Sequence, residues 1–416
     1  MLSSPRLLIC VGVVSVLGTT LAACSAPTPA TTTSASAAGA APSDAAPVSN
    51  GAAQVTLSLV NDGTDKCTLD HTSAAAGPVT FTVTNVSSTA ITEVELLSDL
   101  KIVREKENLA PGLPASSFTV TLDGGSYTVY CPGGNPENQV FTVTGQAAAT
   151  PTGSTAQLLS EGTQQYAEWV TTQAEAMRTA ISALKQAVDS GDVTAARAAY
   201  VKARPFYEKI ESDVEGFVLP GFKVSDNHGN LDYLIDMRAS SLDDKVGWSG
   251  FHAVERDLFQ SGKITDRTKK YAADLEANVG KLIDLVKTLE YKPEDLANGA
   301  ASLLEEVQAN KITGEEEQFS HIDLVDFASN VEGAKQAFAN LQPGLDKIDP
   351  TLTAQIVTQF KSIDTALEKY RDPSAPGGYL SWTKENRTKY AKGLSQAVLA
   401  LQQPLQKIAE KVATAK

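Results

Sequence analysis

Short segments between residues 55 and 143 alternate apolar and polar positions and are rich in Val, Thr, Phe and Tyr. They occupy residues 55–60, 79–83, 118–122, 127–130 and 140–143. Turn sequences such as Asp-Gly-Gly at 123–125 and Pro-Gly-Gly at 132–134 separate them. Period-two alternation between such turns is typical of half-buried β-strands. The pattern therefore predicts an all-β sandwich over residues 52–145.

Beyond an Ala/Thr/Pro/Gly segment at residues 146–155, apolar positions recur with the period of a helix. One stripe runs from Tyr166 to Val188 and stops at Gly191, and Asp192 is placed to cap a second helix that reaches Phe217. Gly commonly ends helices, and Asp accepts hydrogen bonds from the free amides at a helix start. Further stripes lie at 275–289, 303–307, 356–370 and 390–412. We expect residues 156–416 to form an all-α helical bundle, and the chain to be multidomain.

The N-terminus has the pattern of a bacterial lipoprotein signal. Arg6 precedes an apolar run at residues 7–23, and Leu21-Ala-Ala-Cys24 closes that run. We expect residues 1–23 to be a signal peptide and Cys24 to carry a diacylglyceryl anchor, which holds the chain on the extracytoplasmic side of the cell membrane. The Ala/Thr/Ser/Pro-rich residues 24–51 are predicted to be a disordered tether. A plain secretory signal or an uncleaved anchor is the alternative.

The formal net charge of −14 at pH 7 makes nucleic acid an unsuitable partner, because an acidic surface repels phosphate. Four cysteines are present. Cys10 would be lost with the signal and Cys24 would be lipidated, which leaves Cys67 and Cys131. In an oxidising compartment these two can form a disulfide.

His252 and Glu255 stand out as candidate metal ligands, because the chain has only four histidines. Residues three apart share one face of a helix, so the imidazole and the carboxylate can converge on one ion. Two ligands are too few for tight binding, so further carboxylates must come from elsewhere. A hydrogen-bonded, partly buried histidine is the alternative.

Two other segments offer such carboxylates. Glu208, Glu211 and Glu215 are spaced to share one helical face, for which a solvated surface is the alternative. The second reservoir comprises Glu315, Glu316, Asp323 and Asp326. Of these, Asp323 can instead cap a helix.

Four blocks of the chain resemble the EfeO group of iron-uptake components. They are Gly250-Phe-His-Ala-Val-Glu255, Arg204-Pro-Phe-Tyr-Glu-Lys-Ile-Glu211, the Gly-Glu-Glu and Asp-Leu-x-Asp-Phe block at residues 311–333, and the acidic segments at 93–97 and 104–112. This resemblance implies a cupredoxin-like sandwich followed by an imelysin-like helical domain. It also implies a metal site at His252 and Glu255. The resemblance marks these blocks as important but does not tell which carboxylate reaches the ion, so Glu208, Glu211, Glu215, Glu316 and Asp323 stay candidates from their spacing.

The same resemblance implies that the cargo is iron, as Fe²⁺ or Fe³⁺, and that the partners are an iron permease in the membrane and a haem peroxidase of the same system. Ligand type alone does not select iron, since imidazole plus carboxylates also binds zinc and manganese. For the β-domain, the resemblance implies a copper or ferric-iron role. We therefore predict a protein that captures iron outside the cytoplasm and delivers it to the permease.

The predicted sandwich lacks the partners of a blue-copper site. Cys131 follows the segment 127–130, where a cupredoxin offers its thiolate, but no histidine follows it before His228. Two alternatives remain: a Cys67–Cys131 disulfide, or an unusual metal site that uses these cysteines with Glu93, Glu95 and Glu105.

Two other functions compete with iron delivery. A helix-borne zinc peptidase commonly uses His-Glu-x-x-His, but Arg256 follows Glu255 and no second histidine completes the motif. The other is a carbohydrate- or surface-binding lipoprotein with a structural metal. We expect no enzyme, apart from an accessory ferroxidase-type role.

Overall fold

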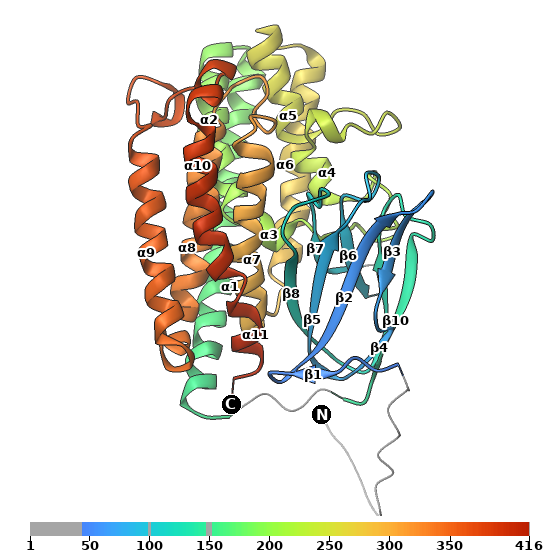
Figure 1. Cartoon of the computed structure of the whole chain (residues 1–416). Helices are drawn as coiled ribbons and strands as arrows, with labels where there is room; N and C mark the ends of the chain where they lie inside the picture. The colour runs from blue at the N-terminus through green and yellow to red at the C-terminus, as the bar shows by residue number, and fades with distance from the viewer. Residues whose placement is uncertain (1–43, 99–100, 147–151, 416) are drawn as a thin grey trace, which may run out of the picture. The chain divides into compact units, whose positions relative to one another are not determined.

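The computed structural model describes residues 44–98, 101–146 and 152–415 (Figure 1). The described residues belong to one compact unit. The predicted signal peptide, Cys24 and most of the predicted tether lie outside the described residues. Within these residues, no helix is long and apolar enough to cross a membrane.

The β region consists of two five-stranded sheets, with strand orders β1-β2-β5-β8, where β3 also pairs with β2, and β4-β10-β9-β6-β7. The strands are β1 Val48–Ser49, β2 Ala52–Asn61, β3 Asp65–Leu69, β4 Ser73–Ala75, β5 Gly77–Asn85, β6 Val94–Ser98, β7 Lys101–Lys106, β8 Ser116–Leu122, β9 Gly125–Tyr130 and β10 Asn138–Thr144. Pairing is antiparallel except for β2 with β5 and β4 with β10. The short strand β1 lies in the range that we expected to be tether.

One hydrophobic core joins the two sheets. Phe81 of β5 stacks on Phe118 of β8 with ring centroids 5.1 Å apart, and it meets Phe141 of β10, in the other sheet, at 5.2 Å. All three rings are buried. Aromatic side chains that pack across facing sheets bury large apolar areas and stabilise a sandwich. The predicted β fold is therefore confirmed.

Strands β6 and β7 did not follow from the pattern of the sequence. Their charged residues Glu95 and Lys106 are 5% and 2% exposed, although such residues usually mark a solvated face. Lys106 is buried because its ammonium contacts both carboxylate oxygens of Glu305, in the helical region, at 2.8 Å. A buried ion pair therefore joins this strand to the helical region.

Among the described residues, the helical region contains seven helices of ten or more residues, with short helices and π-helical turns between them. The helices are α1 Ser154–Ser190, α2 Val193–Glu208, α3 Glu211–Val214, α4 Leu231–Asp236, η1 Ala239–Ser241, α5 Gly250–Glu255, η2 Arg256–Ser261, α6 Asp266–Val286, α7 Pro293–Glu306, η3 Val307–Lys311, α8 Asp323–Ile348, α9 Pro350–Glu368, η4 Pro376–Gly378, α10 Lys384–Leu405 and α11 Ile408–Ala413. This arrangement confirms the predicted helical domain.

The boundary between α1 and α2 is the one that the sequence predicts. Gly191 adopts φ 77°, in the left-handed region, and the Asp192 side chain accepts a 2.9 Å hydrogen bond from the amide of Ala195. Helix α2 ends earlier than expected, at Glu208, just after Pro205. Proline lacks an amide proton and weakens the helix at its position. The chain then turns before α3, so Glu211 and Glu215 do not continue the helix that carries Glu208.

Cys67 and Cys131 are joined by a disulfide, with Cα atoms 6.3 Å apart. Both residues are buried in the core of the sandwich. A disulfide holds no thiolate, so in this state neither sulfur offers the ligand that a cupredoxin gives to copper.

We predict that Gly162→Ala destabilises the protein by about 2 kcal/mol or more. Gly162 lies inside α1, where an added Cβ would overlap the carbonyl oxygen of Asn340 on α8. Gly280→Ala is the matched control, because Gly280 also lies inside a helix but has no atom within 4 Å of an added Cβ. Replacing it is expected to stabilise the helix by about 0.5–1 kcal/mol. Denaturant unfolding of both variants checks this, and equal effects would contradict the close approach of α1 and α8.

Candidate metal centre

The short helix α5 carries His252, and a glycine sets its position. Gly250 has φ 67°, and an added Cβ would overlap the carbonyl of Ile235, the penultimate residue of α4. Glycine is needed where the backbone is left-handed and a neighbouring chain comes this close. The contact brings the end of α4, with Asp236, next to His252.

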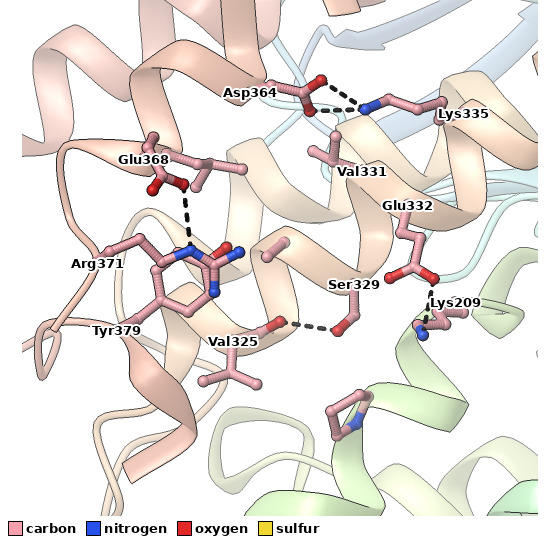
Figure 2. A pocket seen from close by; sticks show the side chains of 13 residues that line it. Lys209, Val325, Ser329, Val331, Glu332, Lys335, Asp364, Glu368, Arg371 and Tyr379 are labelled. Carbon is pink, nitrogen blue, oxygen red and sulfur yellow. Dashed lines mark hydrogen bonds and ion pairs between the residues drawn. The ribbon is translucent and has the colours of Figure 1, made fainter. Parts of the chain in front are cut away.

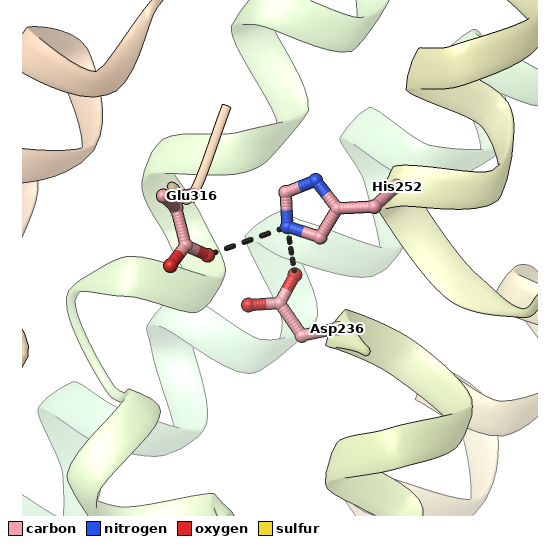
Figure 3. A group of neighbouring side chains, drawn as sticks. All are labelled: Asp236, His252 and Glu316. Atoms are coloured by element: carbon pink, nitrogen blue, oxygen red, sulfur yellow. Dashed lines mark hydrogen bonds and ion pairs between the residues drawn. The ribbon is translucent and has the colours of Figure 1, made fainter. Parts of the chain in front are cut away.

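Three side chains converge at this point from separate segments (Figure 3). The Nε2 atom of His252 lies 3.3 Å from Oε1 of Glu316 and 3.5 Å from Oδ1 of Asp236. Each of the three residues is at most 5% exposed. Their ligand atoms all lie within 4.8 Å of one another, which is close enough to surround one cation. We call Asp236, His252 and Glu316 the His252 centre.

Glu255 lies on the other side of the imidazole. Its Oε2 is 2.8 Å from Nδ1 of His252, and its Oε1 accepts 2.7 Å hydrogen bonds from the amides of Phe319 and Ser320. The shared helical face that the sequence predicts for His252 and Glu255 is thus present. Carboxylates that accept a ring N–H fix the tautomer and orientation of a ligating histidine. A second group, His252, Glu255 and Glu317, also meets the spacing for a cation.

Buried cations neutralise part of this acidic region. The guanidinium of Arg204 contacts Asp236, Glu208, Glu316 at 3.0 Å, Glu317 at 2.9 Å and Asp326 at 3.5 Å. The Arg204 side chain is fully buried, and so are those of Glu208, Glu316, Glu317 and Asp326. Removing one partner from such a network leaves an uncompensated buried charge, which costs several kcal/mol.

Lys311 is the second buried cation. Its Nζ lies 3.2 Å from Glu208, 3.4 Å from Glu211, 3.2 Å from Glu316 and 3.7 Å from Glu306. Lys311 ends the π-helical turn η3, and π-turns interrupt regular helices mostly at functional sites. The structure therefore brings the predicted ligands Glu208, Glu211 and Glu316 together around an ammonium group.

In the His252 centre, the pKa values of His252 and Asp236 are raised and that of Glu316 is lowered. Burial disfavours protonated His252, but hydrogen bonds to Glu255 and Glu316 outweigh it and raise the imidazole pKa. Burial raises the pKa of Asp236 to about 7, against the lowering effect of Arg204 and His252. For Glu316, Lys311 and Arg238 overcome burial and lower the pKa. The metal-free centre thus holds a proton that a cation can displace.

Some buried carboxylate oxygens have no hydrogen-bond partner among the described residues. They include Oδ2 of Asp323 and Oδ1 of Asp326. The other oxygen of Asp323 accepts a 3.2 Å hydrogen bond from the amide of Glu317. Unpartnered buried acceptors are rare in proteins and call for an explanation such as an ion or water. Asp323 thus supports the turn that carries Glu317, and it has one acceptor to spare.

Glu215 does not contact Lys311, but it lines a space that Glu211 and Glu306 of the Lys311 network also line. This space is a cavity of about 300 Å³, which we call the acidic cavity. Glu93, Glu95, Glu105 and Glu107 line it from the β region. Glu215, Asp232 and Asp236 line it from the helical region. Ligand atoms of Glu93, Glu105 and Glu107 lie within 4.8 Å of one another, and we call these three the Glu93 group.

A second pocket in the helical region, of about 450 Å³, has no converging group of buried acids among the described residues that line it (Figure 2). Its cations are paired with nearby acids: Lys209 with Glu332 at 2.9 Å, Lys335 with Asp364 at 2.6 Å and Arg371 with Glu368 at 3.4 Å. Exposed pairs of this kind contribute little and present no converging ligands. The buried His252 centre is therefore the stronger candidate site.

Comparison with known proteins agrees with this geometry. Residues 162–408 match the family model described as Imelysin. The chain is 34% identical over 345 residues to the iron uptake system component EfeO of Escherichia coli K12, covering 81% of this chain and 84% of the relative. The chain belongs to the EfeO family. The EfeO proteins of Shigella flexneri and of Escherichia coli O1:K1 match it over the same 81% and 84%.

A solved structure also resembles the chain, at lower similarity. It is a crystal structure from Parabacteroides distasonis, of a protein described as an iron-regulated protein A precursor. The sequences are 16% identical, the TM-score is 0.47, and the match covers 64% of this chain and 97% of that one.

The sequence did not single out Asp236, Glu317, Arg204 or Lys311 as parts of the site. Asp236 is an isolated acid in the apolar stretch Tyr-Leu-Ile-Asp-Met at residues 233–237, which is a signal that it faces the interior. Arg204 and Lys311 carry no such signal. Only the fold shows that acids surround them.

We predict that the metal-free protein loses stability as the pH rises from about 5 to 8. Burial raises the pKa of Asp323 from 3.8 to about 8, so between these values the folded state binds a proton that the unfolded state has released. The unfolding free energy then falls with rising pH, by up to about 1.4 kcal/mol per pH unit for each such group. Denaturant unfolding with a chelator present measures the slope.

Asp323→Asn should flatten that slope, because the amide stays neutral at every pH in this range. Asp364→Asn is the control, since Asp364 forms an exposed pair with Lys335. An unchanged slope in Asp323→Asn would contradict the assignment.

Proposed function

We propose that this protein is a membrane-tethered iron-binding component that captures iron outside the cytoplasm and delivers it to a membrane iron permease. The observation that carries this proposal is the convergence of Asp236, His252 and Glu316 in a buried, acid-rich space of an EfeO-type chain. The lipid anchor at Cys24 and a haem peroxidase partner belong to the proposal as the resemblance implies them.

The geometry supports an assignment of roles within the centre. A neutral imidazole has one lone pair, and Nε2 is the atom that faces Asp236 and Glu316. Glu255 is then the acceptor of Nδ1–H and orients the ring. We therefore assign His252, Asp236 and Glu316 as ligands and Glu255 as the positioning residue.

One imidazole with carboxylates suits iron in either oxidation state, and it also admits zinc and copper. Selection of iron then depends on availability and on the charge of the site, which the nearby acids make strongly negative. Glu208, Glu211, Glu317 and Asp323 are placed to compensate a higher cation charge or to complete the coordination after a small rearrangement.

Capture and release follow from the same proton balance. Iron replaces protons on His252 and Asp236, so binding releases protons and strengthens as the pH rises through the pKa of about 7 of Asp236. Delivery requires the reverse exchange. Protonation of these ligands, or a competing carboxylate on the permease, would release the ion.

The β region is proposed to contribute a second, carboxylate-based cation site at the Glu93 group, with Glu95 beside it. Oxygen ligands without thiolate favour a hard cation such as Fe³⁺ over Cu⁺. The disulfide between Cys67 and Cys131 fits this proposal, because the site then uses none of the sulfur chemistry of a blue-copper protein. A ferroxidase-type role would place oxidation at this group.

We predict that His252→Ala weakens binding of ferrous iron by about 100-fold or more, because the one nitrogen ligand is lost. Glu255→Gln should weaken it by about tenfold, since the amide can no longer hold the ring as a charged acceptor. Anaerobic equilibrium dialysis with zinc as competitor measures both effects.

His228→Ala is the matched control. His228 also pairs with an acid, Asp226, at 2.9 Å, but its side chain is 55% exposed. This variant should bind iron within about twofold of the parent protein, as an exposed pair contributes little. Equal binding by the parent and His252→Ala would reject the His252 centre. Loss of binding in His228→Ala would show that iron binding does not depend on the His252 centre alone.

A further inference from the structure

One positively charged side chain lines the cavity that the Glu93 group shares with Asp236 of the His252 centre. Among the described residues that line the acidic cavity, Arg238 alone has a positively charged side chain. It follows directly after helix α4 and lies two residues beyond Asp236. Its side chain is 20% exposed, which leaves the guanidinium reachable from the cavity.

The acidic cavity leads to the His252 centre. Asp236 lines the cavity, and its Oδ1 is 3.5 Å from Nε2 of His252. Glu306 also lines the cavity, and its Oε2 lies 3.7 Å from Nζ of Lys311 inside the buried network. A cation in the cavity would therefore meet ligands of the His252 centre without crossing an apolar layer.

Arg238 contacts an acid that lines the cavity and an acid of the His252 centre. Its NH1 atom lies 2.9 Å from Oε2 of Glu306 and 3.4 Å from Oε2 of Glu316, and its Nε lies 3.8 Å from Glu315. It also lines the same cavity as the three acids of the Glu93 group. The guanidinium thus occupies a position that an incoming metal ion would favour.

A second feature is a buried acceptor in the cavity that lacks a hydrogen-bond partner. Glu95 lines the cavity, is 5% exposed, and has an Oε2 atom without a hydrogen-bond partner among the described residues. A buried acceptor without a partner, facing an acid-lined space, indicates that the space takes up a cation.

We propose that Arg238 is the internal counter-cation of the route between the Glu93 group and the His252 centre. In the metal-free protein it binds Glu306 and Glu316. A metal ion that moves from the cavity to the centre displaces the guanidinium from Glu316 and takes its place. Arg238 is thus a positioning residue that sets the affinity of the centre, and this inference rests on the iron-binding function proposed above.

The physical reason is competition between like charges. A guanidinium a few ångströms from the bound metal repels it, and it binds Oε2 of the same Glu316 carboxylate whose Oε1 faces His252. Its removal should therefore tighten metal binding, the reverse of what loss of a ligand does. The effect is reduced by solvent screening at a residue that is partly exposed.

The test compares ferrous iron binding, measured by anaerobic equilibrium dialysis, in the parent protein, Arg238→Gln and Arg238→Lys. Arg238→Gln should bind iron about tenfold more tightly, whereas Arg238→Lys, which keeps the charge, should stay within about threefold of the parent. Arg197→Gln is the control for loss of an arginine, because Arg197 binds the carbonyl of Leu258 and does not line the cavity. It should leave affinity unchanged.

A second measurement needs no stable Arg238→Gln protein. In the parent protein with nitrogen-15-labelled arginine, zinc serves as a diamagnetic probe, and Arg238→Lys identifies the Nε–H signal of Arg238. Zinc should shift this signal in the parent protein. It should not shift the signal in His252→Ala at zinc concentrations that saturate the parent.

The outcomes separate the two proposals. Unchanged or weaker iron binding by folded Arg238→Gln, or an unmoved signal on zinc binding, overturns the role of Arg238 and leaves the His252 centre intact. Equal binding by the parent and His252→Ala overturns the centre itself, and the role of Arg238 falls with it. Tighter binding in Arg238→Gln that is lost in the double variant with His252→Ala supports both.

Discussion

Burial of many carboxylates in one helical interior is the constraint on which this structure depends. Asp236, Glu255, Glu316 and Glu317 are at most 5% exposed, and ionised carboxylates pay a large desolvation penalty in such surroundings. The chain reduces the penalty in three ways: it buries the cations Arg204 and Lys311 among the acids, it keeps some acids protonated, and it directs backbone amides at Glu255. Acids remain in excess even so. A metal cation would supply the missing charge, which links the stability of the interior to the cargo.

Irregular backbone places these groups, although most of the region is regular helix. The left-handed Gly250 brings α5 against the end of α4, the π-helical turn η3 delivers Lys311, and a run of turns between η3 and α8 delivers Glu316 and Glu317. Long helices such as α1 and α8 supply the rigid frame around these short segments. A site built on breaks in helices can change its coordination with small backbone movements, while the frame keeps its spacing.

The sequence predicted what depends on local chemistry. The end of α1 at Gly191, the cap at Asp192 and the shared face of His252 and Glu255 all follow from neighbours within a few residues. It did not predict features that depend on distant partners. Strand β7 was missed because Lys106 is neutralised by Glu305, far along the chain, and Asp236 was missed as a ligand because only the contact at Gly250 brings it to His252. Likewise, no pattern separates a buried Arg204 from an exposed arginine.

The internal cations have opposite effects on the two states of the protein. In the metal-free state, the charges of Lys311 and Arg238 and a hydrogen bond to His252 lower the pKa of Glu316, and Arg204 contacts the same carboxylate. If a metal ion binds as proposed, the same charges would repel it. A protein that only stored iron would gain from fewer such cations, because its affinity would rise. A protein that passes iron onward needs a bound state that is not too stable and an empty state that does not unfold, and buried lysine and arginine residues beside the ligands satisfy both requirements.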